Sequence, residues 1–278
     1  MLITRIITAV VLLVVLLAVL FGGYYPAFAA VVLLFLTAAI TESFQLFKSS
    51  RKQAFLVALF WSAAFAYAFL YKDNSAVKFW FGLSTLLWLF RFVPALKTGL
   101  PPPEGGRNTM LATMYAISIV ACFAAIVLFF KHSAVYLLSV MALVWIADIG
   151  AYFSGKAFGK RKLAPTISPG KSWEGAIGGG IAVLVLSSLL IMFAGPLLAD
   201  TFPVHLQARL GWGGTLAVLV VLVAASVVGD LVESQLKRRA GVKDSSNLLP
   251  GHGGVLDRID ALVPVMPLAA LIYTGMLL

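Results

Sequence analysis

The chain has 278 residues, of which 61% are hydrophobic and 12% charged, and its formal net charge is +10 at pH 7. A soluble domain of this size carries roughly 25% charged residues, so the composition excludes a water-soluble globular fold. Solidly apolar runs exclude an outer-membrane barrel, whose strands alternate polar and apolar residues. The cationic loops of a membrane protein account for the basic charge, and we expect no nucleic-acid partner. The single cysteine, Cys122, excludes an internal disulfide and a Cys-rich metal site.

Nine apolar stretches have lengths suited to helices that cross a bilayer. In chain order they cover residues 6–21, 27–47, 54–71, 77–93, 110–130, 134–154, 175–199, 212–236 and 259–278. The fourth is short, so a re-entrant segment is an alternative there. We therefore predict an all-α, polytopic membrane bundle of about nine transmembrane helices, with a single domain over residues 1–278.

The first stretch resembles a secretory signal, because Arg5 precedes it and Ala27-Phe28-Ala29 could supply a small-residue cleavage site. The sequence stays apolar to Ile40, however, and no polar mature start follows. We favour a transmembrane helix that is retained.

Charge asymmetry predicts the orientation. If the N-terminus is cytoplasmic and all nine stretches cross, the inner segments hold 17 of the 21 Lys and Arg residues. The outer segments hold only Lys72, Lys78, Lys131 and Arg209. The positive-inside rule therefore predicts an inner N-terminus, an outer C-terminus and a cytoplasmic location for the basic segments 156–171 and 237–258.

Most of the 11 acidic residues lie after residue 140. Asp148, Asp230 and Glu233 interrupt or end apolar stretches, where a carboxylate is costly unless it faces a polar cavity with a partner. An ion pair that only locks helices together is the alternative. The clustering of these carboxylates favours a functional site.

Spacing places several of these side chains together. Four residues, at positions i, i+3, i+4 and i+7, share one face of a helix: Asp230, Glu233, Ser234 and Lys237. Asp257 and Asp260 are one turn apart if the ninth helix begins there. Carboxylates without His or Cys favour a hard cation such as Mg²⁺ over zinc.

The two basic segments lie beside these acids. Lys and Arg next to a carboxylate-bound metal suit a polyphosphate substrate, although the positive-inside bias alone could explain them. The segment Pro250-Gly251-His252-Gly253-Gly254 would let backbone N–H groups approach a phosphate, with a plain turn as the alternative. His252 could donate to phosphate, transfer a proton or make a structural hydrogen bond.

A second segment, Ser168-Pro169-Gly170-Lys171-Ser172, could present Lys171 and Ser172 at the start of the seventh helix. It is not a P-loop, because Pro165 stands where that motif requires glycine. Four glycines follow within that helix, at positions 175, 178, 179 and 180. We interpret them as core packing, with a homodimer contact as the alternative.

A run of 27 residues carries the most specific pattern in the chain. It reads Ser234-Gln-Leu-Lys237-Arg238, four residues, Lys243-Asp244, then Leu249-Pro250-Gly-His252-Gly253-Gly254-Val-Leu-Asp257-Arg258-Ile-Asp260. This run resembles the signature of the phosphatidate cytidylyltransferase family, also called CDP-diacylglycerol synthases. Residues 141–260 carry nearly all of the resemblance, whereas residues 1–140 match only as apolar helices and residues 261–278 form the last helix.

The resemblance implies transfer of CMP from CTP to phosphatidate at the inner face of the cell membrane, with Mg²⁺ and a second cation site. Asp230 and Asp257 would be the principal metal ligands, and Asp148 and Asp260 secondary ones. The expected catalytic residues are Asp230, Asp257, Lys237, Lys243 and His252. The expected substrate-binding residues are Lys171, Ser172, Arg238, Gly253, Gly254 and Arg258.

Two other functions are alternatives. A CTP-dependent polyprenol or lipid-alcohol kinase would use the same nucleotide but transfer its γ-phosphate. An ion-coupled transporter would also carry buried carboxylates. Transporters often show related halves with paired broken helices, whereas the unusual segments here are concentrated in one half.

Overall fold

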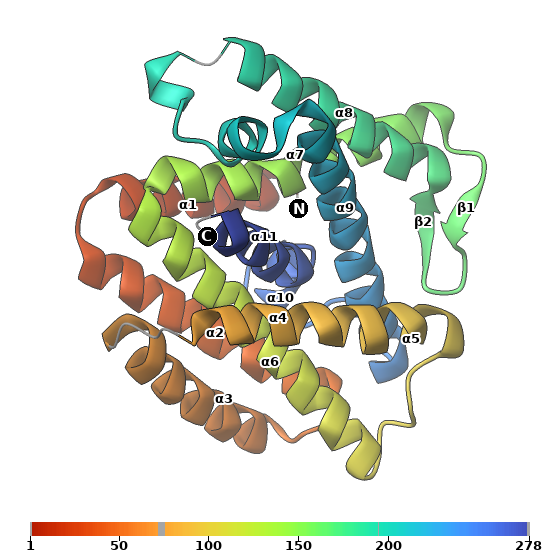
Figure 1. Cartoon of the computed structure of the whole chain (residues 1–278). Coiled ribbons are helices and arrows are strands. Elements are labelled where there is room, and N and C mark those ends of the chain that lie inside the picture. The colour runs from red at the N-terminus through yellow and green to blue at the C-terminus, as the bar shows by residue number, and fades with distance from the viewer. Residues whose placement is uncertain (1, 72–75, 194, 277–278) are drawn as a thin grey trace.

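The computed structural model describes residues 2–71, 76–193 and 195–276, with side chains from residue 6 onward (Figure 1). Arg5 and Lys72, which belong to the predicted charge pattern, and the last two residues of the ninth stretch lie outside these described side chains. The helices are α1 (Leu2–Phe21), α2 (Tyr25–Leu46), α3 (Arg51–Phe65), α4 (Val77–Leu87), α5 (Val93–Thr98), α6 (Gly106–His132), α7 (Ala134–Phe158), α8 (Trp173–Phe193), α9 (Phe202–Ala240), α10 (Leu256–Ile259) and α11 (Leu262–Met276). Two π-helical segments, Ala66–Tyr71 and Trp88–Phe92, extend α3 and join α4 to α5, and Pro196–Leu198 forms a 3₁₀ turn.

Seven helical segments of the described residues are long and apolar enough to cross a membrane. They are Tyr25–Leu46, Arg51–Tyr71, Val77–Thr98, Gly106–His132, Ala134–Phe158, Trp173–Phe193 and Phe202–Ala240. The predicted α-helical membrane architecture is therefore confirmed. The first and ninth stretches form shorter apolar helices, Ile6–Phe21 and Leu262–Met276, so nine crossings and the orientation remain predictions.

Helix α9 contains a break. Gly211 has φ 64° and ψ −177°, which lies outside the helical region. Glycine adopts such a positive φ more readily than other residues. The predicted eighth stretch, 212–236, corresponds to the part of α9 after this residue. The helix ends at Ala240, and Gly241 after it adopts the left-handed conformation common after a helix C-terminus.

A β-hairpin departs from the predicted all-α class. Strands β1 (Lys162–Ala164) and β2 (Ser168–Ser172) are antiparallel, and Lys162 lies opposite Ser172. Figure 1 shows the hairpin projecting from the bundle beside α8 and α9. Pro165 and Pro169 disfavour a helix here, because proline lacks the N–H that a helix interior needs.

Helices α6 and α11 form the centre of the bundle. In the most apolar part of α6, 72% of the residues are buried inside the protein, whereas the corresponding share in α8 is 17%. Helix α11 contacts α4, α6 and α9. Helix α8 instead exposes Ile177, Ile181 and Val185 along one side, as expected for a helix that faces lipid.

The predicted small-residue face of α8 packs against α7 within the same chain. A Cβ on Gly175 would lie 2.9 Å from the Ala151 carbonyl oxygen, and Cβ atoms on Gly178 and Gly179 would collide with Ser154 and the Ala147 carbonyl. Gly180 differs, because the nearest atom would be 3.7 Å away on Val223. Core packing is therefore confirmed for three of these glycines.

We expect Gly179→Ala to destabilise the protein by about 1–3 kcal/mol, because the added methyl group forces α7 and α8 apart. Gly180→Ala is the matched control and should melt like the wild type, since its methyl group meets only an ordinary contact. Thermal denaturation of the purified proteins in detergent measures the difference. Equal melting temperatures for the two variants would contradict this close packing.

Candidate active site

Lys237 on α9 lies between two buried carboxylates. Its ammonium group forms an ion pair with Glu233, one turn earlier, and with Asp257 Oδ1 at 2.7 Å. The Glu233 side chain is 0% exposed and that of Asp257 3%. The predicted helix face is thus present, and its lysine joins α9 to α10. Removing one member of such a triad leaves a buried charge without its partner, which is strongly destabilising.

Asp257 organises the loop that precedes α10. Its Oδ2 atom accepts hydrogen bonds from Ser245 N (2.9 Å), Ser245 Oγ (2.8 Å) and Gly254 N (2.7 Å). Burial by itself raises the pKa of Asp257, but the hydrogen bonds from Lys237 and Gly254 outweigh it and hold the pKa below its ordinary value. The carboxylate is therefore ionised at neutral pH, and its contribution to stability is lost as the pH falls through this lowered pKa.

Glycine is required in this loop. Gly253 has φ +82°, and a Cβ on it would lie 2.7 Å from Asp257 Oδ2. A Cβ on Gly254 would lie 2.6 Å from Glu42 Oε2. The predicted glycine segment therefore wraps closely around carboxylates of the protein itself.

Glu42 is a site residue that the sequence analysis missed. It lies on α2, is 4% exposed, and accepts hydrogen bonds from Leu256 N (2.7 Å) and Val255 N (3.1 Å) at the start of α10. Its oxygens also accept bonds from Ser246 Oγ (2.6 Å) and Ser245 Oγ (3.1 Å). The sequence does contain an indication of its role, because Glu42 is a charged residue near the end of an apolar stretch, as Asp230 is.

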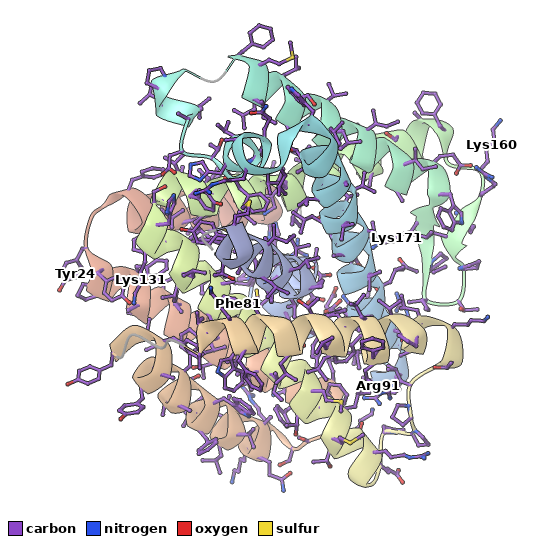
Figure 2. All side chains as sticks on the ribbon, viewed as in Figure 1. Tyr24, Phe81, Arg91, Lys131, Lys160 and Lys171 are labelled. Atoms are coloured by element: carbon purple, nitrogen blue, oxygen red, sulfur yellow. The ribbon has the colours of Figure 1, made fainter. Side chains whose placement is uncertain are left out.

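The hairpin brings Lys171 to α9, where its ammonium group pairs with Asp230. Figure 2 shows Lys171 in the space between the hairpin and α9. The other Asp230 oxygen accepts a hydrogen bond from Ser234 Oγ at 3.2 Å. Arg238 Nε donates to the Ile167 carbonyl at 3.4 Å and so ties the hairpin to α9.

Two cavities meet at Asp148. The polar cavity, of about 460 Å³, lies between α7, the hairpin, α8 and α9, and its charged lining residues are Asp148, Lys156, Lys171 and Asp230. The apolar cavity, of about 370 Å³, lies between α1, α2, α6 and α7. Its charged lining residues are Asp148, Asp257, Arg258 and Asp260. A chamber with two lysines and two carboxylates therefore adjoins a hydrophobic one, and Asp148 lies where they meet.

Six predicted site residues line neither cavity: Lys237, Arg238, Lys243, His252, Gly253 and Gly254. Lys243 is exposed and lines neither cavity. His252 is half-buried, and its backbone N–H closes a turn onto the Leu249 carbonyl. Ser172 lines the polar cavity, but its hydroxyl accepts a hydrogen bond from Gly175 N at 3.1 Å and so caps the start of α8.

The carboxylates fit a hard cation better on α9 than on α10. Asp148, Asp230 and Asp260 offer the oxygen ligands that Mg²⁺ prefers, although in the described residues their ligand atoms do not all lie within 4.8 Å of one another. Asp230 Oδ1 accepts a hydrogen bond from Ser234 Oγ, and its Oδ2 pairs with Lys171, which leaves lone pairs on both oxygens for a metal. Asp257 Oδ2 accepts three hydrogen bonds, and its Oδ1 accepts one from Lys237 Nζ at 2.7 Å, so both oxygens already have donors. Asp230 and Asp257 bind different lysines and line different cavities.

The chain is similar to known proteins over most of its length. The sequence model of the cytidylyltransferase family matches residues 3–276. The chain is 48% identical over 176 residues to a phosphatidate cytidylyltransferase of Haemophilus influenzae, covering 60% of this chain and 58% of the relative. The corresponding protein of Pseudomonas aeruginosa is 55% identical over 140 residues, covering 50% and 48%. That of Bacillus subtilis is 36% identical over 201 residues, covering 72% and 70%.

The aligned part of this chain thus spans about half the length of the first two of these relatives. The family match itself extends over nearly all of the chain, from the first apolar helix to the last. The resemblance seen in the motifs after residue 140 is confirmed by it. The chain belongs to the cytidylyltransferase family.

Proposed function

We propose that this protein transfers CMP from CTP to phosphatidate, giving CDP-diacylglycerol and pyrophosphate for phospholipid synthesis. The observation that carries the proposal is the pair of cavities that share Asp148, one lined by two lysines and two carboxylates and the other mainly apolar. The relatives named phosphatidate cytidylyltransferase support the same choice of substrates.

The apolar cavity suits the lipid. Leu12 and Leu16 of α1 and Phe28 and Val32 of α2 form part of its wall, so an acyl chain can remain in apolar surroundings. Its volume lies within the range of small-molecule sites. We assign Arg258, which lines the same cavity, to the phosphate of phosphatidate, because a guanidinium group binds phosphate oxygens in pairs.

The polar cavity suits the nucleotide. Lys156 and Lys171 would neutralise the triphosphate of CTP, which arrives from the cytoplasm in the predicted orientation. Substrate phosphate would compete with Asp230 for the Lys171 ammonium group. Lys171 would then exchange its ion pair with Asp230 for one with substrate phosphate. Lys237 would stay between Glu233 and Asp257 and support the loop before α10.

The reaction is an in-line displacement at phosphorus. An ionised phosphate oxygen of phosphatidate forms a bond to the α-phosphorus of CTP, and the bond from that phosphorus to the bridging oxygen of the β-phosphate breaks. The nucleophile is already ionised at neutral pH, so the protein needs no strong general base. Its main tasks are to align two anions and to neutralise their charge.

We assign Mg²⁺ to Asp230, with Asp148 and Asp260 as secondary ligands, and we assign Asp257 to a second cation, which would share Oδ1 with Lys237. When bound, the ion supplies charge neutralisation at the α-phosphate. Lys171 and Arg258 hold the two substrates, and Glu42 keeps α10 in place so that Asp257 and Arg258 face the apolar cavity.

The assay that tests the proposal uses purified protein, phosphatidate and CTP labelled at either the α- or the γ-phosphorus. We expect only the α-label to enter lipid, with one pyrophosphate released for each liponucleotide and with dependence on a divalent cation. Label from the γ-position in lipid would indicate a lipid kinase instead. Solute flux across sealed vesicles without CTP would indicate a transporter.

Asp230→Asn and Asp257→Asn should each lower kcat/KM at least about 100-fold, because each removes a charge that balances the phosphate and metal site. The melting temperatures should differ. Asp230→Asn changes a partly exposed pair and should melt like the wild type, whereas Asp257→Asn removes a partner of buried Lys237 and should melt lower. Glu104→Gln, at an exposed acidic residue, is the control. Near-normal turnover of Asp230→Asn would contradict the metal assignment.

The proposed orientation in the cell membrane follows from the basic segments. In a Cys122→Ala background, Val242→Cys should react with a membrane-impermeant maleimide only from the cytoplasmic side. Leu197→Cys, in the linker between α8 and α9, should react only from the opposite side. Both original side chains are exposed, at 41% and 89%, so access to the reagent is not limiting. The reverse labelling pattern would overturn the orientation.

A further inference from the structure

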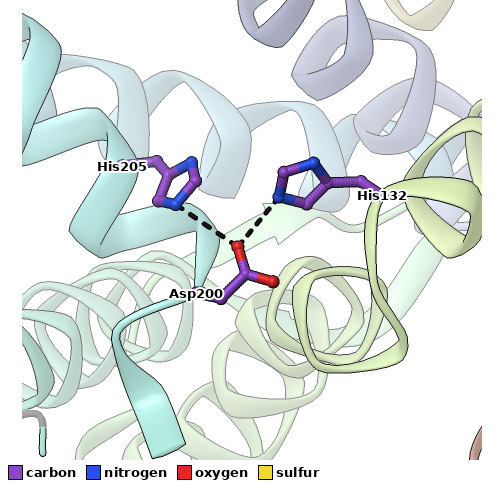
Figure 3. Close-up of side chains that lie close together, drawn as sticks. All are labelled: His132, Asp200 and His205. Carbon is purple, nitrogen blue, oxygen red and sulfur yellow. Dashed lines mark hydrogen bonds and ion pairs between the residues drawn. The ribbon is translucent and has the colours of Figure 1, made fainter. Parts of the chain in front are cut away.

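Three potential metal ligands converge near the beginning of α9, far from the proposed active site. Figure 3 shows His132, at the end of α6, and His205, in α9, on two sides of Asp200, which lies in the linker before α9. His132 Nε2 is 2.8 Å and His205 Nε2 is 3.3 Å from the same atom, Asp200 Oδ1. The chain has only three histidines, and two of them meet here.

This cluster is separate from the carboxylates of the proposed active site. Asp230 lies towards the other end of α9, beyond the break at Gly211. At 1.5 Å per helical residue, the segment from Gly211 to Asp230 alone spans about 28 Å. The predicted orientation places the cluster on the outer side of the membrane, so the cytoplasmic chemistry does not account for it.

We propose that His132, Asp200 and His205 bind a Zn²⁺ ion through Nε2, Oδ1 and Nε2. Two imidazole nitrogens and one carboxylate oxygen form a donor set typical of zinc and unsuited to Mg²⁺. Their ligand atoms all lie within 4.8 Å of one another. Ligand atoms around a tetrahedral zinc ion, with bonds of about 2.0–2.1 Å, are about 3.3 Å apart. The His205–Asp200 distance matches this spacing, and the His132–Asp200 distance needs to widen by about 0.5 Å.

Neighbouring residues orient two of the ligands. The Tyr273 hydroxyl of α11 lies 3.0 Å from His132 Nδ1, so a hydrogen bond at Nδ1 leaves Nε2 for the metal. Ser133 Oγ donates to Asp200 Oδ2 and leaves Oδ1 directed at the histidines. Ser133 also caps α7 by accepting a hydrogen bond from Tyr136 N at 3.0 Å, which fixes its own position. Zinc ligands in proteins commonly accept or donate such hydrogen bonds, which fix their orientation toward the metal.

A cavity of about 300 Å³ adjoins the cluster. It is lined by His132, His205, Ala208, Arg209, Tyr273 and Met276. Three protein ligands leave one tetrahedral position for water or for an anion from this cavity, and the positive charge of Arg209 favours the anion. The bound ion would join the ends of three segments: α6, the linker after α8, and the start of α9.

The test uses the full-length protein in detergent, purified without a polyhistidine tag, stripped with a chelator and kept in millimolar Mg²⁺ to occupy carboxylate sites. We expect one Zn²⁺ per chain, and substitution with Co²⁺ should give the intense visible absorption of a four-coordinate site. His132→Gln, His205→Gln and Asp200→Asn should each weaken zinc binding at least about 100-fold. Tyr273→Phe should weaken it about 10- to 100-fold, because it removes only the support of His132.

Two matched controls should bind zinc like the wild type: His252→Gln, which removes the third histidine, and Glu104→Gln, which removes an exposed carboxylate. Zinc should raise the melting temperature of the wild type and of both controls but not of the ligand variants. Melting curves without metal show whether each variant is folded, and the cobalt spectrum of the wild type tests the site without any substitution. Absence of zinc binding, a six-coordinate cobalt spectrum, or ligand variants within threefold of wild-type affinity would overturn the proposal and leave a hydrogen-bonded cluster only.

Discussion

The contact between Lys237 and Asp257 fixes the geometry on which the rest of the proposed active site depends. It joins the last turns of α9 to α10, which are separated in sequence by a long loop. Glu233 supplies a second buried carboxylate to the same lysine. Buried charges are tolerated only when partners surround them, so neither helix can shift without breaking this arrangement. The loop between them is in turn anchored to Asp257 by hydrogen bonds from Ser245 and Gly254.

The N-terminal half, which carries no recognisable motif, is also part of this arrangement. Glu42 on α2 receives the first free N–H groups of α10 and two serine hydroxyls of the preceding loop. Helices α1 and α2 provide much of the apolar cavity wall. The motif-rich segment thus cannot form its site alone, and the family match over residues 3–276 is consistent with this dependence.

Apolar run lengths predicted the helices well, because a bilayer imposes a minimum length on any helix that crosses it. Helical periodicity also placed Asp230, Glu233 and Lys237 on one face correctly. Contacts between segments distant in the sequence could not be predicted from these patterns. The serine and glycine donors that saturate Asp257 Oδ2 and the cap that Ser172 provides depend on how separate segments meet in space. Asp200 gave no periodic signal either, because it lies in a linker between helices.

The break at Gly211 has a mechanical consequence for α9. An unbroken helix would behave as a stiff rod and would transmit any tilt of its first turns to Asp230. The non-helical backbone at Gly211 instead divides α9 into two helical parts, because the helical hydrogen-bond pattern is interrupted there. The segment that carries His205 and the segment that carries Asp230 therefore need not share one helical axis, although both belong to α9.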